Sequence, residues 1–283
     1  MAGDSVGGGA AIAQIMDRTP TPILVLSPGG VDRDSPPVVD ALVAGALDAL
    51  PAPARWTPER GDELRRRARQ LSNVQVIRHM RGRRRSGEVA HGNLPPVVAV
   101  AASTGGPSAI ATLLAGFGEL AVPVLVVQHL HPQFTSGLLG WMARSSALPV
   151  EMASPGQFAR PGKVYLAPTG MHLRLGPGQR LELGTEPVIT HRPSADVLFA
   201  SVAEHAGAAG VGVLLTGMGD DGARGLLEIR EAGGQTFAQD EQSCAVFGMP
   251  RAAWQLGAVR DLHPLDKLAA VVSEAVASIG GRR

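Results

Sequence analysis

Residues 97–107 have the sequence VVAVAASTGGP, which gives the clearest indication of the fold class. Its first six residues form an apolar run without polar alternation, which is typical of a strand buried on both faces of a parallel sheet. The two glycines allow a tight backbone turn, and Pro107 suits the first turn of a helix. A buried strand that turns at once into a helix indicates an α/β fold.

The chain beyond this stretch extends the same pattern. Two more valine-rich apolar runs occupy residues 122–127 and 211–215. Apolar residues at three- and four-residue spacings predict helices between and after these runs. The helices are expected around residues 110–117, 134–142, 197–205 and 265–276. Buried strands that alternate with helices predict a doubly wound, mostly parallel sheet flanked by helices.

The middle of this region has a different pattern. Three short apolar runs, at residues 164–167, 172–175 and 180–183, are separated by turns that contain glycine. Short runs with this spacing are typical of antiparallel hairpins. We therefore expect an antiparallel hairpin insertion in the otherwise parallel fold.

Fewer helices and strands are predicted within the first 54 residues than in the region after residue 97. The expected ones are the end of a helix at 10–16, a strand at 22–26 and a helix at 38–47. A helix, a strand and a helix bury too little surface to form a core of their own.

Residues 55–96 differ from both neighbouring regions by their arginines and their weak hydrophobic periodicity. Eight of the arginines form two clusters, Arg65, Arg66, Arg67 and Arg69, and Arg81, Arg83, Arg84 and Arg85. This composition favours a mobile linker, with a short helix around residues 60–71, over a specific nucleic-acid site. Trp56 is the only aromatic residue of the segment, which argues against the stacking of single-stranded bases.

The composition also bounds the compartment. The single cysteine, Cys244, excludes an intramolecular disulfide and favours a reducing environment. The first residues lack the basic start of a signal peptide, and no apolar run approaches the roughly 18 residues of a membrane helix. We therefore expect a soluble, cytoplasmic protein without membrane insertion.

Three polar residues each follow one of the predicted buried strands. Ser103 follows the first run, His129 follows the second with Gln128 between, and Asp221 closes the loop after the third. Ligands of open parallel sheets bind outside the carboxyl ends of the strands, so these three residues can converge there. A hydroxyl nucleophile, an imidazole base and a carboxylate are the groups that acyl transfer needs. Free amides at the helix start after Ser103 can stabilise an oxyanion.

The residue types alone leave other functions open. A glycine-rich turn from strand to helix is also typical of phosphate sites, which would make the chain a nucleotide-binding regulator. His129 is also consistent with a packed histidine at a strand end. Asp220 and Asp221 together suggest a metal site, although no further ligands with metal-type spacing accompany them. Spacing by itself does not decide between these alternatives and a hydrolase.

Six blocks of the sequence together closely resemble the catalytic domain of the chemotaxis-receptor glutamate methylesterases, the CheB family. The blocks are VAVAASTGGP (98–107), QH (128–129), PQFT (132–135), HRPSADVLF (191–199), VLLTGMGDDG (213–222) and SCAVFGMPR (243–251). They occur in the order of the family, and the resemblance extends from about residue 97 to the C-terminus. It implies a methylesterase catalytic domain at residues 97–283.

The resemblance implies roles for individual residues. The family's nucleophilic serine falls on Ser103, its histidine on His129 and its aspartate on Asp221. Thr104 and Met218 match residues beside the family's oxyanion site.

Four nearby residues receive no catalytic role from the resemblance. Asp220 is not the triad acid, His131 is a local substitution, and Cys244 is expected to be a small buried core residue. Ala101 departs from the family, which commonly has glycine two residues before the serine.

The implied function is that of a serine hydrolase. It demethylates glutamate γ-methyl esters on methyl-accepting chemotaxis receptors and releases methanol, and the family can also deamidate receptor glutamines. The resemblance implies neither a cofactor nor a metal. The alternative is a non-catalytic receptor-binding module of the same fold.

The N-terminal region resembles a fragment of a second family. Residues 15–27 (IMDRTPTPILVLS) and 41–53 (ALVAGALDALPAP) are similar to the second half of a phosphoacceptor receiver domain. This implies a partial receiver-like segment at 1–54, where a chemotaxis kinase or another regulator would dock. The chain is thus expected to comprise this segment, the arginine-rich linker 55–96 and the catalytic domain 97–283.

We predict that phosphorylation of this segment does not switch the chain. The family's acceptor aspartate and acidic Mg²⁺ pocket would fall before residue 1, and the place of its lysine falls on Ala52. Ser27 occupies the Ser/Thr place, but Asp4 has no preceding strand and cannot replace the acceptor. Without acceptor, pocket and lysine, there is no two-state element for a phosphoryl group to bias.

Incubation with a small phosphodonor or a phosphorylated chemotaxis kinase tests this prediction. The expected result is an unlabelled polypeptide whose esterase rate does not change. Label on the chain, or methanol release that rises with the donor, would contradict it.

Overall fold

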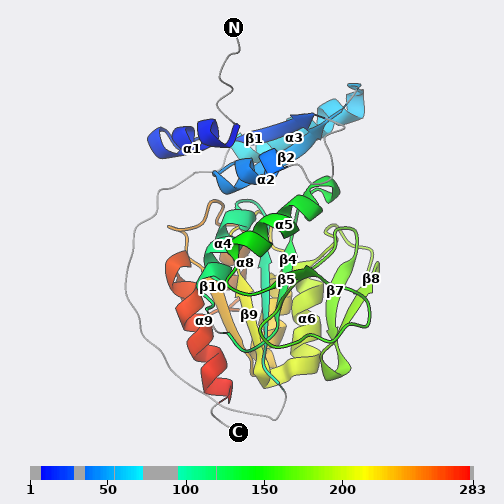
Figure 1. The fold of residues 1–283 in the computed structure, drawn as a ribbon, viewed down its shortest axis with the longest axis vertical. Coiled ribbons are helices and arrows are strands. Elements are labelled where there is room, and N and C mark those ends of the chain that lie inside the picture. The colour runs from blue at the N-terminus through cyan, green and yellow to red at the C-terminus, as the bar shows by residue number, and fades with distance from the viewer. Residues whose placement is uncertain (1–7, 29–35, 54, 73–94, 119, 281–283) are drawn as a thin grey trace.

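The computed structural model describes residues 8–28, 36–53, 55–72, 95–118 and 120–280. Its main body, within these residues, is a seven-stranded parallel sheet with the order β11-β10-β9-β3-β4-β6-β5 (Figure 1). The strands are β3 (Val97–Ala102), β4 (Val124–Gln128), β5 (Val150–Met152), β6 (Val164–Leu166), β9 (Gly210–Leu214), β10 (Gln235–Gln239) and β11 (Leu262–His263). The expected α/β class and the mostly parallel sheet are confirmed.

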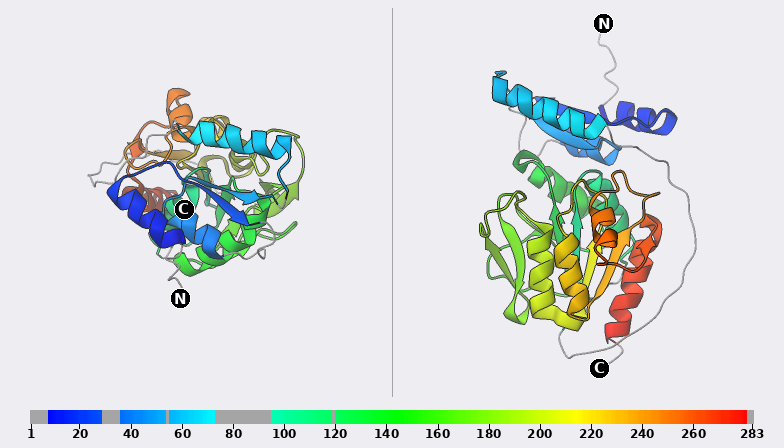
Figure 2. Two further views of the ribbon diagram at one scale, coloured as in Figure 1. Left: turned by 90° about the horizontal axis from the view of Figure 1, so that it is seen from above. Right: turned by 180° about the vertical axis from the view of Figure 1, so that it is seen from behind.

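Helices cover both faces of this sheet (Figures 1 and 2). One face packs against α4 (Gly106–Ala115), α5 (Thr135–Ser145) and α9 (Leu265–Gly280), and the other against α6 (Ala195–Ala206), α7 (Ala223–Glu231) and α8 (Met249–Gln255). Side chains of β3 alternate between the two cores, with Val98 and Val100 on one side and Val97 and Ala99 on the other. Because both faces of β3 are buried, its sequence is apolar without alternation.

The direction of winding reverses at β3. The chain leaves β3 for β4 on one side, whereas its other neighbour, β9, leads outward to β10 and β11. The loops that follow adjacent strands diverge at such a switch point and leave space at the carboxyl ends. The loops after β3, β4 and β9 therefore meet at the end of the sheet formed by the carboxyl ends of its strands.

The predicted hairpin insertion is present, with one correction. β7 (His172–Gly176) and β8 (Arg180–Gly184) pair antiparallel. The expectation is wrong for residues 164–167, because this run provides β6, which pairs in parallel with β4 and β5. Its three side chains are all buried, as in a central strand, and it lacks the polar alternation of a solvent-facing hairpin. Short 3₁₀ helices occur at Pro132–Phe134, Pro177–Gln179 and Gly207–Ala209.

The N-terminal elements form a separate layer beyond one end of the sheet (Figures 1 and 2). They are α1 (Gly8–Arg18), β1 (Leu24–Pro28), α2 (Pro36–Val43), β2 (Asp48–Ala52) and α3 (Pro58–Ser72), and β1 pairs with β2 in parallel. The helix expected around residues 60–71 is confirmed as α3. Strand β2 was not predicted. Its Pro51 is tolerated because β2 pairs on one side only.

One apolar contact joins this layer to the main body, and an ion pair connects two elements within the layer. Phe134, which follows β4, is buried in one cluster with Ile12, Val38 and Leu42. An ion pair between Arg67 and Asp48 joins α3 to β2. Residues 73–94 of the expected linker lie outside the described residues, as does Asp4.

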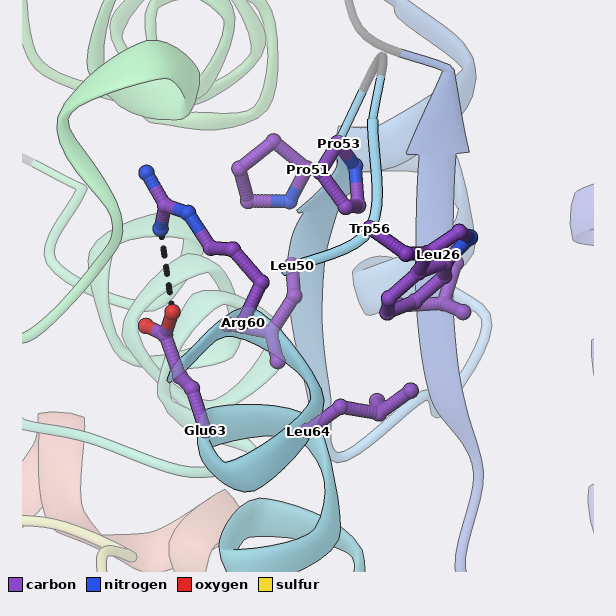
Figure 3. Close-up of a pocket in the computed structure, with 8 residues that line it drawn as sticks. All are labelled: Leu26, Leu50, Pro51, Pro53, Trp56, Arg60, Glu63 and Leu64. Atoms are coloured by element: carbon purple, nitrogen blue, oxygen red, sulfur yellow. Dashed lines mark hydrogen bonds and ion pairs between the residues drawn. The ribbon is translucent and has the colours of Figure 1, made fainter. Parts of the chain in front are cut away.

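A pocket lies between β1, β2 and α3 (Figure 3). It is lined by Leu26, Leu50, Pro51, Pro53, Trp56, Arg60, Glu63 and Leu64. Trp56 and Leu26 are 55% and 42% exposed, so this part of the layer presents apolar surface to solvent.

A bilayer could not be crossed by any helix of the described residues, since none is both long and apolar enough.

We predict that Phe134→Ala releases the N-terminal layer. Removing a buried phenylalanine typically costs about 3–5 kcal/mol, and here the lost contacts join the layer to the main body. Limited proteolysis should then cleave within residues 8–72 sooner than in the wild type. Phe158→Ala is the matched control, because Phe158 is largely exposed. If the Phe134 variant resists cleavage as the control does, this packing does not hold the layer.

Candidate functional site

Ser103 lies in the turn that joins β3 to α4. Its carbonyl accepts a hydrogen bond from the amide of Gly106 at 2.8 Å, which closes the turn. Gly105 has a φ of 74°, and a Cβ at this residue would lie 2.5 Å from the Cβ of Ala245. Only glycine meets both conditions, which explains the glycine that follows Ser103 and Thr104.

The loop after β9 holds this turn from the other side. The amide of Ser103 donates to the carbonyl of Thr216 at 3.0 Å, and the Thr216 hydroxyl donates to the carbonyl of Thr104 at 3.0 Å. A Cβ at Gly217 would lie 2.8 Å from the Cβ of Ser103. Glycine at 217 therefore allows the loop to pass directly beside the candidate nucleophile.

Gln128 links Ser103 to the candidate base. Its side-chain amide nitrogen donates to the carbonyls of Ser103 at 2.8 Å and of His129 at 2.9 Å, and the residue is only 4% exposed. A Cβ at Gly106 would lie 2.0 Å from Gln128 Oε1, so glycine there makes room for this side chain. Sequence reasoning did not assign Gln128 a role; its place between a buried strand and His129 was the available signal.

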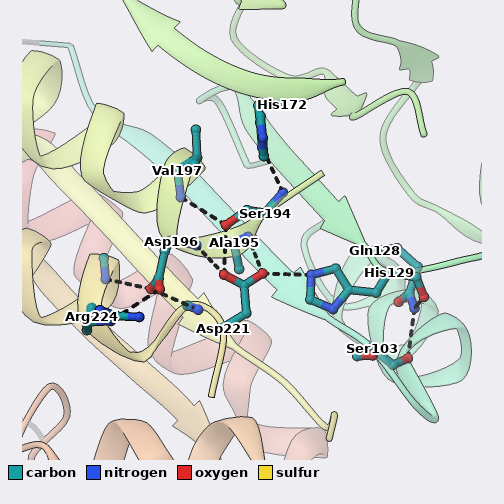
Figure 4. A network of polar contacts seen from close by, with 12 residues as sticks. Ser103, Gln128, His129, His172, Ser194, Ala195, Asp196, Val197, Asp221 and Arg224 are labelled. Carbon is teal, nitrogen blue, oxygen red and sulfur yellow. Dashed lines mark hydrogen bonds and ion pairs between the residues drawn. The ribbon is translucent and has the colours of Figure 1, made fainter. Parts of the chain in front are cut away.

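His129 and Asp221 form a direct hydrogen bond (Figure 4). Nε2 of His129 lies 2.8 Å from Oδ2 of Asp221, and the side chains are 11% and 8% exposed. An ionised carboxylate can only accept, so in the neutral imidazole Nε2 holds the proton and Nδ1 has the free electron pair. Within the described residues, Nδ1 has no hydrogen-bond partner.

The Asp221 carboxylate sits at the N-terminus of α6 (Figure 4). It accepts hydrogen bonds from the Ser194 hydroxyl at 2.7 Å and from the amides of Ala195 at 2.8 Å and Asp196 at 3.0 Å. Burial alone would raise the pKa of Asp221. The hydrogen bond and charge of His129, together with the two amides, outweigh burial and hold that pKa well below its usual value. Asp221 therefore stays ionised.

A second carboxylate, that of Asp196, makes the reverse connection, from the start of α6 to the start of α7. Asp196 Oδ1 accepts from the amides of Gly222 and Gly225, both at 2.9 Å, at the start of α7. Burial raises the pKa of Asp196, against the effect of these amides. Ser194 and Asp196 were not predicted as site residues. The serine just before a helical pattern was a recognisable N-cap signal, and its hydroxyl does cap α6.

The ring of His191 stacks on the ring of His129, with centroids 4.5 Å apart and planes inclined by 11°. Nitrogen and oxygen atoms of these two residues and Asp221 lie within 4.8 Å of one another. A metal would have to lie in the plane of each ring that binds it, because the lone pairs are in-plane. Two nearly parallel stacked rings cannot both meet this condition, so the arrangement does not fit a metal centre.

The remaining predicted residues lie around this centre. Within the described part of the chain, Ser103 reaches His129 through Gln128, and the two side chains share no direct hydrogen bond. Apo structures often show such loose geometry between nucleophile and base. Thr104 is buried with its hydroxyl unpartnered among the described residues, and Met218 is partly buried.

Four further residues were predicted to have no catalytic role, and their environments are consistent with this. Asp220 is exposed, Ala101 is buried within β3, and His131 caps the short helix Pro132–Phe134. Cys244 is buried, and burial raises the pKa of its thiol, so the sulfur stays protonated and unreactive.

Similar proteins were found at three levels. Residues 98–272 match the family model described as CheB methylesterase. The chain is 46% identical to protein-glutamate methylesterase/protein-glutamine glutaminase 2 of Anaeromyxobacter dehalogenans, over 94% of this chain and 79% of that protein. It is 41% identical to protein-glutamate methylesterase FrzG of Myxococcus xanthus, over 93% and 80%. The crystal structure of the Thermotoga maritima CheB methylesterase catalytic domain superposes with a TM-score of 0.61 at 32% identity, covering 63% of this chain and 97% of that one.

We predict that Gln128→Leu slows ester hydrolysis more than it weakens substrate binding. The variant removes both donors that hold Ser103 and His129 in register, and a misplacement of about 1 Å can cost about 10²-fold in rate. Steady-state kinetics should show a lower kcat with a nearly unchanged KM. Gln157→Leu is the control, since Gln157 bonds Glu151 and Ser154 instead. Equal kcat values for the two variants would contradict the claim that Gln128 positions Ser103 and His129.

Proposed function

Because the chain belongs to the CheB methylesterase family, we propose that it is a serine hydrolase that demethylates glutamate γ-methyl esters on chemotaxis receptors and releases methanol. The observation that supports this most directly is the 2.8 Å hydrogen bond between His129 and Asp221, at the strand ends beside Ser103. Residues 97–283 are proposed as the catalytic domain and residues 1–54 as a partial receiver-like segment.

The proposed mechanism follows from the protonation state of His129. Nδ1 takes the proton of Ser103, because Nε2 already holds the proton shared with Asp221. Ser103 Oγ attacks the ester carbonyl, and His129 returns the proton to the methoxy oxygen as methanol leaves. Water then attacks the acyl-enzyme by the same route. Asp221 stabilises the imidazolium without taking its proton, since α6 keeps the carboxylate ionised.

The oxyanion of the tetrahedral intermediate needs donors close to Ser103. Thr104 and Met218 are proposed to line this place. Thr104 follows Ser103 at the start of the turn, and Met218 follows Gly217, whose Cα passes against Ser103. This assignment rests on their position and on the resemblance to the family.

Deamidation of receptor glutamines is proposed as a second reaction of the same centre. Attack of Ser103 on a glutamine side-chain amide gives the same acyl-enzyme and releases ammonia in place of methanol. The names of two similar proteins include protein-glutamine glutaminase, which favours this extension.

Compartment and regulation complete the proposal. The chain is proposed to act in the cytoplasm on methyl-accepting receptors. A chemotaxis kinase or another regulator is proposed to contact the N-terminal layer, where Leu26 and Trp56 present apolar surface beside the pocket of Figure 3.

We predict that Ser103→Ala abolishes methanol release from methylated receptor membranes. Loss of a triad nucleophile typically lowers kcat by about 10⁶-fold, because the remaining groups cannot form the acyl-enzyme. The measurement is volatile radiolabelled methanol from membranes with methyl-labelled receptors. Ser108→Ala, in the first turn of α4, is the matched control. Release by the Ser103 variant at the wild-type rate would exclude the mechanism. A wild-type chain that binds receptors without releasing methanol would favour a non-catalytic binding module.

A further inference from the structure

The ring of His191 lies against that of His129, the proposed base, but His191 takes no part in the proposed proton transfers. Its ring faces that of His129 at 4.5 Å with an inclination of 11°. It lies between β8 and α6, far from His129 in the sequence. The stack therefore joins the segment before α6 to the loop after β4.

The ring of His129 needs a second constraint besides Asp221. The hydrogen bond to Asp221 holds Nε2, but the χ2 torsion of histidine has a broad minimum. Rotation about χ2 changes the direction of Nδ1, the other ring nitrogen. A flat group in contact with the ring face opposes this rotation by steric exclusion.

The segment with His191 is anchored to the same frame as Asp221. The carbonyl of Arg192 accepts from the amide of Gly170 at 3.1 Å. Ser194, three residues after His191, donates to the Asp221 carboxylate at 2.7 Å. The stacked ring and the carboxylate are thus held by one short stretch of chain, so both constraints act on His129 together.

The charge state of His191 suits this position. Burial lowers the pKa of His191 and the neighbouring His129 lowers it further, as does Arg67 of α3, whereas Asp221 and Asp220 act in the opposite direction. The ring is therefore neutral at neutral pH. It adds no positive charge beside the imidazolium that forms on His129 during proton transfer.

We propose that His191 is a positioning residue: its stacked ring keeps the imidazole of His129 in the plane in which Nε2 faces Asp221 and Nδ1 can take the proton of Ser103. The activity part of the test rests on the proposed esterase function. The role requires a flat ring at residue 191 but does not require a titratable nitrogen there.

Two variants of the full chain separate the ring from its nitrogens. His191→Ala removes the flat surface and should lower kcat by about 10²-fold, as expected for a misplaced base, with little change in KM. His191→Phe retains a flat ring and should recover most of the lost kcat, with the acid limb of the pH–rate profile at its wild-type position. His205→Ala, in the last turn of α6, is the histidine control. If His191→Ala does not fold, His191→Leu fills the space without a flat face and replaces it.

Three kinetic outcomes would overturn the proposal. A Phe variant as slow as the Ala variant would mean that a nitrogen of His191 is needed. An Ala variant as fast as the wild type would mean that the stack has no effect. A change in KM alone would make His191 a substrate contact.

Nitrogen-15 NMR of the histidine rings gives a readout that does not depend on the substrate. Relaxation of the His129 Nε2–H group should show a rigid ring in the wild type and in His191→Phe, and a more mobile ring in His191→Ala. An equally rigid ring in all three proteins would refute the positioning role. Failure of the wild type to release methanol from receptor membranes would instead refute the proposed function and leave the NMR result unaffected.

Discussion

The carboxylate of Asp221 at the N-terminus of α6 is the interaction on which the rest of the site depends. It accepts hydrogen bonds from Ser194, Ala195 and Asp196. His129 and the amides of Ala195 and Asp196 together keep it ionised although it is buried. A buried anion at a helix start is stabilised by the unpaired amides and the helix dipole together. Since that anion can only accept from His129, it also decides which imidazole nitrogen remains free. The tautomer of the candidate base is therefore a consequence of where α6 begins.

Close backbone approach is the second constraint. Glycines at 105, 106 and 217 lie where any Cβ would collide with a neighbour, and each gap admits a specific partner. Gly106 makes room for Gln128, and Gly217 lets the loop after β9 pass beside Ser103. The glycine-rich character of the Ser103 turn, which by itself also suits a phosphate site, thus has a packing explanation in this fold.

Much of the fold could be predicted because its central strands have an unambiguous pattern. β3 and β4 are buried on both faces, and their strand ends position Ser103 and His129. The pattern failed where it depends on partners distant in sequence. The run 164–167 is apolar without alternation, but it is too short to show that β4 and β5 flank it in parallel. Pro51 obscures β2 because an edge position cannot be recognised from sequence. The stack of His191 on His129 and the hydrogen bonds to Asp221 likewise could not be predicted, because they form only when the segment before α6 folds back to the switch point.

The central claim is that Asp221 and His129 activate Ser103 as a nucleophile. Peptide mass spectrometry after reaction with a fluorophosphonate tests this most directly, because the reagent forms a stable adduct with an activated serine and needs no receptor. The expected result is one phosphonyl group, on Ser103, and loss of labelling in His129→Ala and in Asp221→Asn. Labelling of another residue, or equal labelling of Ser103 in the His129 variant, would contradict it.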